Sequence, residues 1–117
     1  MREELERRLV ERWPGWFDVL GFENGDGWFP LLWKLFTDLE PLVEALEGES
    51  GQPFSVVRVR EEAGGLRVYV SEATDAIAER IEAAHEQSRR TCEVCGEVGS
   101  RRQDGWIRTR CEEHWDE

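Results

Sequence analysis

The sequence predicts an α+β fold, in which helices pack on a two-stranded antiparallel β-hairpin and a zinc ribbon follows at the C-terminus. Apolar residues recur at helical spacing through residues 31–46, and two alternating apolar segments flank a pair of glycines at residues 64–65. Two pairs of metal-ligating residues lie within residues 92–114. We therefore expect a body of helices and a hairpin over residues 1–90, and the ribbon over residues 91–117.

The N-terminal part is predicted to contain a helix over residues 2–12, followed by an irregular connection. The apolar side of this helix consists of Leu5, Leu9 and Val10. The Trp13-Pro14-Gly15 segment ends the helix, because proline disfavours a helical residue before it. Residues 14–29 hold four glycines, which argues against one regular element, and several aromatic residues, which argue against a flexible linker.

A longer helix is predicted to begin at Pro30, which suits a first turn because its missing N–H has no helical partner there. The apolar positions of this helix are Leu31, Leu32, Leu35, Phe36, Leu39, Leu42, Val43 and Leu46. Pro41 lies inside the pattern, so either the helix kinks there or it ends near Leu39 and a second helix begins. Residues 47–51 end the segment.

Two strands and a further helix complete the predicted body. Residues 54–60 and 66–71 alternate as strands do, and residues 61–65 supply the glycines of a hairpin turn. Residues 73–90 are predicted to form a helix with a narrow apolar stripe. That stripe consists of Ile77, Ile81 and Ala84. We expect this helix and the preceding one to cover the hairpin.

The cysteines form a metal-binding pattern with one histidine, C-x2-C-x15-C-x2-H. Its members are Cys92, Cys95, Cys111 and His114. A Cys3His set matches structural Zn²⁺ in ligand type and number, and four protein ligands leave no open position for catalysis. All three cysteines lie in the pattern, which argues against a disulfide framework. The alternatives are three free thiols beside a surface histidine, or a catalytic or redox site.

Charge is distributed unevenly along the chain, whose net charge is −11. Residues 1–88 carry −10, residues 89–110 carry +3 and residues 111–117 carry −4. The acidic body repels phosphate, which argues against wholesale wrapping of nucleic acid. The sequence has no run of about 18 apolar residues and no apolar core of a signal peptide, so we expect a cytoplasmic protein without a membrane span.

Four segments carry a resemblance to a known family: GDGWFPLL at 25–32, GGLRVYV at 64–70, TCEVCGEVG at 91–99 and GWIRTRCEEH at 105–114. Over residues 20–115 the chain resembles a widespread family of short, uncharacterised bacterial and prophage proteins with a C-terminal Cys3His zinc-ribbon motif. All four expected ligands match the family. Family members often carry a Lys-Glu-Lys-Phe-like stretch before the double glycine, where this chain has Arg60-Glu61-Glu62-Ala63. The resemblance implies a phage or mobile-element setting and no settled activity.

The leading functional hypothesis is a small acidic, zinc-stabilised protein-interaction module that binds a host or phage protein. The sequence shows no catalytic constellation, so we do not expect an enzyme. Six tryptophans in 117 residues favour an interface, because tryptophan is enriched in binding hot spots. The candidate partner-binding residues are Trp16, Trp28 and Phe29; the alternative is that Trp13, Trp16, Trp28 and Trp33 form the core. The acidic body also permits an inhibitor that mimics DNA.

The alternative function is nucleic-acid binding by the arginine-rich ribbon. Its candidate residues are Arg101, Arg102, Trp106, Arg108 and Arg110. Arginines beside an exposed aromatic ring can hold a single strand or a duplex backbone. In the competing interpretation these arginines form ion pairs with nearby glutamates and are not available to bind phosphate.

Overall fold

The computed structural model describes residues 1–18 and 21–117, and in this part of the chain it confirms the predicted α+β class. The helices are α1 (Glu3–Arg12), the short 3-10 helix η1 (Asp26–Trp28), α2 (Phe29–Ser50) and α3 (Asp75–Ser88). The strands are β1 (Phe22–Glu23), β2 (Val56–Glu62), β3 (Gly65–Val70), β4 (Ser100–Arg102) and β5 (Arg108–Arg110).

Among the described residues the sheet of the body has three strands, so the predicted two-stranded hairpin is present but forms only part of the sheet. β2 and β3 pair antiparallel with Val59 opposite Val68, as a hairpin does. β1 adds a parallel strand on the other side of β2, with Phe22 opposite Val59. The third strand forms because pairing with β2 places the Phe22 ring in the core, where it is only 5% exposed.

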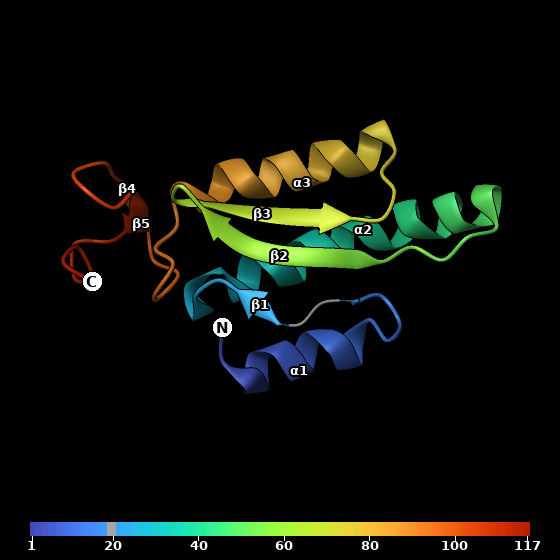
Figure 1. Ribbon diagram of the computed structural model, residues 1–117, viewed down its shortest axis with the longest axis horizontal. Helices are drawn as coiled ribbons and strands as arrows, with labels where there is room; N and C mark the ends of the chain where they lie inside the picture. The colour runs from blue at the N-terminus through green and yellow to red at the C-terminus, as the bar shows by residue number, and fades with distance from the viewer. Residues whose placement is uncertain (19–20) are drawn as a thin grey trace.

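The helices enclose one apolar core against this sheet. Figure 1 shows α1 beside β1, α3 running along β3, and α2 passing behind the sheet. α2 continues through Pro41, so the alternative of two separate helices is wrong. Pro41 lies on the exposed side of α2, while Leu39 and Val43 on the other side are buried. α2 ends at Ser50 and is capped by Gly51, whose φ of 69° is the left-handed conformation that glycine adopts at helix ends.

The N-terminal tryptophans belong mainly to the core. Trp13 is 3% exposed, and its indole Nε1 donates a hydrogen bond of 2.6 Å to Glu40 Oε1. Trp28 is completely buried, while Trp16 and Trp33 are half-buried against the same core. Large aromatic rings therefore supply much of the buried area in this small body, which favours the core interpretation of these residues.

The C-terminal segment lies at one end of the molecule, next to the turn between β2 and β3 (Figure 1). Thr109 Oγ1 donates a hydrogen bond of 2.6 Å to the Gly64 carbonyl oxygen, and Arg101 Nη2 donates one of 3.0 Å to the Ala63 carbonyl oxygen. These contacts attach residues 91–117 to the body.

The β2–β3 turn holds a non-glycine residue in the left-handed region. Ala63 has a φ of 50° and its side chain is exposed. Left-handed backbone costs an L-residue roughly 1–2 kcal/mol, and glycine lacks the Cβ that causes this cost. We expect Ala63→Gly to raise the free energy of unfolding by about 0.5–1 kcal/mol, less than the full cost because glycine is more flexible when unfolded. Urea denaturation measures this change, and destabilisation by the glycine would show that the turn is not strained.

Candidate metal centre

Three thiols and one imidazole nitrogen converge in the C-terminal segment. The four ligand atoms of Cys92, Cys95, Cys111 and His114 all lie within 4.8 Å of one another. The Sγ atoms of Cys95 and Cys111 are 3.7 Å apart, and His114 Nδ1 is 3.2 Å from Cys111 Sγ and 3.7 Å from Cys92 Sγ. The predicted ligand set is therefore assembled as a possible metal site.

The two separations of 3.7 Å match a tetrahedral site, and the one of 3.2 Å is shorter. With Zn–S bonds of about 2.3 Å and a Zn–N bond of about 2.0 Å, a tetrahedron places its sulfurs about 3.8 Å apart and sulfur and nitrogen about 3.6 Å apart. The other imidazole nitrogen, His114 Nε2, is 3.7 Å from Glu117 Oε2. Outer carboxylates of this kind orient histidine ligands toward a metal.

Local turns position the two ligand pairs. In the first, the backbone N–H of Gly96 donates to the Cys92 carbonyl at 2.9 Å, and Gly96 has a φ of 84° that suits glycine. In the second, the N–H of His114 donates to the Cys111 carbonyl at 3.2 Å. The antiparallel hairpin of β4 and β5 joins the pairs.

The thiols influence one another's ionisation. Burial opposes ionisation of the Cys92 thiol, but backbone N–H donors outweigh it and lower the pKa of this thiol to about 7. These donors belong to Cys111, Cys95 and Val94. For Cys95, the N–H of Glu97 favours the thiolate, but burial and the neighbouring thiols raise the pKa to about 11. A divalent cation would remove the repulsion between thiolates and favour the ionised form of all three.

A glycine-rich loop of the body supports the first ligand pair. The N–H of Gly27 donates to the Glu93 carbonyl at 2.8 Å, and a Cβ on Gly27 would collide with the Cys92 carbonyl and with Gly96. Trp28 Nε1 donates to the Thr91 carbonyl at 2.8 Å. The role of this loop is not predicted above, although its two closely spaced glycines at 25 and 27 are a signal that another backbone approaches.

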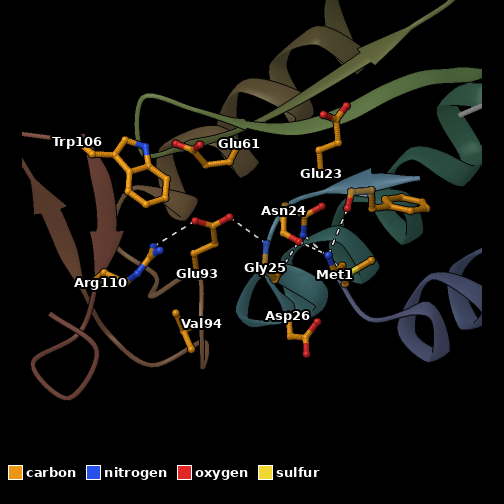
Figure 2. A pocket seen from close by; sticks show the side chains of 11 residues that line it. Met1, Glu23, Asn24, Gly25, Asp26, Glu61, Glu93, Val94, Trp106 and Arg110 are labelled. Carbon is orange, nitrogen blue, oxygen red and sulfur yellow. Dashed lines mark hydrogen bonds and ion pairs between the residues drawn. The ribbon is translucent and has the colours of Figure 1, made fainter. Parts of the chain in front are cut away.

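The buried carboxylate of Glu93 links the same loop to β5. Arg110 Nη1 lies 3.1 Å from Glu93 Oε1, and the two side chains are only 8% and 13% exposed. Glu93 Oε2 accepts a hydrogen bond of 2.9 Å from the Gly25 N–H. Both carboxylate oxygens of Glu93 are therefore used, as the dashed lines in Figure 2 show.

The candidate partner-binding residues differ in how deeply they are buried. Trp28 is fully buried, so its assignment to a partner surface is wrong for this fold: the ring fills the core and its N–H is already bonded. Trp16 is half-buried, with its ring centroid 5.4 Å from that of Phe54. Phe29 is half-buried beneath the Arg8 guanidinium, which lies 4.8 Å from its ring centroid.

The candidate nucleic-acid-binding arginines are largely engaged within the chain. Arg110 is buried against Glu93, and Arg102 lies 2.9 Å from Asp104 and 3.5 Å from Asp116. Arg101 donates to a backbone carbonyl of the β2–β3 turn. Arg108 stacks on the exposed Trp106, with its guanidinium carbon 5.1 Å from the ring centroid.

The fold and the site together define an α+β protein with a Cys3His cluster, held between a hairpin and a glycine-rich loop. Family models, curated proteins and solved structures offer no match to the chain. Among the described residues, every helix is too short or too polar to span a lipid bilayer.

Proposed function

We propose that this chain is a small protein-interaction module whose Cys3His cluster holds a structural Zn²⁺. The ligands would be Cys92, Cys95, Cys111 and His114. Zinc supports this assignment best because it favours thiolate and imidazole ligands in a tetrahedron, which the separations of the ligand atoms fit. Four protein ligands leave no position for a substrate, so the metal would order the hairpin rather than react.

The observation that carries the interaction proposal is the exposure of apolar side chains on the C-terminal segment. Val98 is 86% exposed, Trp106 is 64% exposed and Trp115 is 36% exposed. A segment with few apolar residues does not leave three of them in water for its own stability. Exposed tryptophan is typical of the central residue in a protein interface. The partner surface is therefore proposed at Trp106 rather than at the N-terminal tryptophans.

The arginine contacts favour this proposal over nucleic-acid binding. Arg110 and Arg102 already pair with carboxylates, and a phosphate would have to displace those partners. The net charge of −11 opposes approach of a nucleic acid to most of the surface. A host or phage protein remains the proposed partner, in keeping with the family resemblance.

A photo-crosslinking amino acid at position 106 tests the proposal. We expect zinc-loaded protein that carries benzoylphenylalanine in place of Trp106 to form a discrete, protease-sensitive adduct in a bacterial lysate. The matched control carries the same group in place of Tyr69, an aromatic residue that is 43% exposed on β3. An adduct that nuclease removes would indicate nucleic acid, and equal labelling at both positions would contradict a partner surface at Trp106.

A further inference from the structure

We infer that the groove beside Trp106 binds an arginine side chain from a basic segment of the partner protein. This inference rests on the proposed function and specifies the chemistry of the partner. The groove lies between β1 with its following loop, the end of β2 and the C-terminal segment, and has a volume of about 460 Å³. Figure 2 shows Trp106 and Glu61 on one side of the groove and Asn24 on the other.

The lining of the groove is acidic. Four carboxylates line it, those of Glu23, Asp26, Glu61 and Glu93. Its positive groups are already engaged: Arg110 pairs with Glu93, and the Met1 nitrogen donates to the carbonyl oxygens of Phe22 and Asn24. The groove therefore attracts a cation and repels an anion.

Two of these carboxylates have capacity for a further donor. Glu61 uses Oε2 to accept the Gly64 N–H at 2.7 Å, and no described residue donates to its Oε1. Glu23 has only a loose pair, with Arg58 Nε at 3.5 Å, and its side chain is 61% exposed. Glu93, by contrast, is saturated by Arg110 and the Gly25 N–H, so it contributes negative charge at the base of the groove.

Asn24 supplies an independent indication that a hydrogen-bond donor enters. The residue lines the groove and is only 6% exposed, yet no described residue donates to its buried Oδ1. Buried acceptors without a partner are rare, because desolvation removes their water without replacing it. A guanidinium, with five N–H donors, can satisfy this oxygen and a carboxylate together after a small rotation of the amide.

Trp106 gives the groove an aromatic wall that suits a guanidinium better than an ammonium. The ring already accepts the Arg108 guanidinium at 5.1 Å, which shows that its π-face is presented to a cation. Glu61 and Trp106 line the same groove (Figure 2), so a planar group that stacks on the ring is offered the Glu61 carboxylate as an acceptor. Arginine does both, whereas lysine offers a single point of charge.

Binding of short peptides to the full zinc-loaded chain tests this inference. The probe is acetyl-Gly-Arg-Gly-Arg-Gly-amide, compared with peptides that carry lysine or the neutral isostere citrulline at both arginine positions. We expect the arginine peptide to shift the Trp106 indole N–H in two-dimensional NMR, the lysine peptide to bind more weakly and the citrulline peptide not to bind. Glu61→Gln and Glu23→Gln are each expected to weaken the arginine peptide by about three- to tenfold.

Matched variants distinguish a site from general attraction to an acidic protein. Gln at position 61 keeps an oxygen for the Gly64 N–H, and Glu79→Gln removes the same charge from an exposed position on α3 that does not line the groove. An equal loss in Glu79→Gln, or no shift at Trp106, would overturn the inference. If a protein adduct forms at position 106 but the arginine peptide does not bind, the arginine-groove inference is overturned and the interaction proposal stays intact.

Discussion

Removal of the metal is expected to unfold the C-terminal segment while the body keeps its helices. Zinc binding contributes about 10–16 kcal/mol in small zinc modules. The segment could not replace that contribution, because its Val98 and Trp106 are exposed rather than packed. In the described part of the chain all α-helices lie before residue 89, and the apolar core lies within residues 5–77 apart from Cys92. A chelator or Cys95→Ser should therefore abolish hydrogen-exchange protection in residues 92–117 and spare most of the far-ultraviolet circular dichroism.

The body is nevertheless expected to become less stable. Trp28 Nε1 and the Gly27 N–H lose their hydrogen-bond partners when the segment that carries the first ligand pair moves. Glu113→Gln is the control, since this exposed residue lies between two ligands and should retain the metal. Elemental analysis of the purified protein should find one zinc per chain; less than about half an equivalent would contradict the site. Cooperative loss of all helical signal on chelation would show that the segment and the body form a single folding unit.

Gly27→Ala is expected to destabilise the protein strongly. A Cβ at this position would collide with the backbone of Cys92, Glu93 and Gly96, which the metal ligands hold in place. Overpacking against backbone that cannot move costs about 1–3 kcal/mol, and the displaced loop would also lose the bond from Gly27 N–H to the Glu93 carbonyl. Urea denaturation of zinc-loaded protein should show this loss.

Gly48→Ala provides the opposite control. Gly48 lies within α2, and a Cβ there meets no other atom within 4 Å. Because glycine weakens a helix interior, alanine should stabilise the chain by about 0.5–1 kcal/mol. The free energy of unfolding of Gly27→Ala could instead lie within a few tenths of a kcal/mol of that of the original protein. In that case the glycine-rich loop can move away from the first ligand pair and does not support the metal centre.

Local patterns were sufficient to predict the longer elements. The helical periodicity of residues 31–46 corresponds to α2, and the two alternating segments around the double glycine correspond to β2 and β3. The spacing of Cys92, Cys95, Cys111 and His114 likewise identified the cluster, because two-residue spacings constrain side chains to converge. These features depend on neighbours in the sequence, so the sequence displays them directly.

The residues whose roles were missed depend on contacts between distant segments. β1 has two residues, too few for any periodicity, and exists only because β2 offers a free edge. Tryptophan is common both in protein cores and in interfaces, so the sequence alone leaves both assignments open for Trp28. Its hydrogen bond to Thr91, 63 positions away, places it in the core. The sequence makes Arg110 a candidate phosphate-binding residue, but in the structure it forms a buried ion pair with Glu93.

The fold class, the longer helices and strands, and the four clustered ligands can be predicted from the sequence alone, because each follows from periodicity or short spacing. Which tryptophans remain exposed depends instead on how α2, the sheet and the C-terminal segment pack together. This packing buries Trp28 and leaves Trp106 exposed beside an acidic groove. The physical reason is that a side chain's surroundings are supplied mostly by residues far from it in the chain.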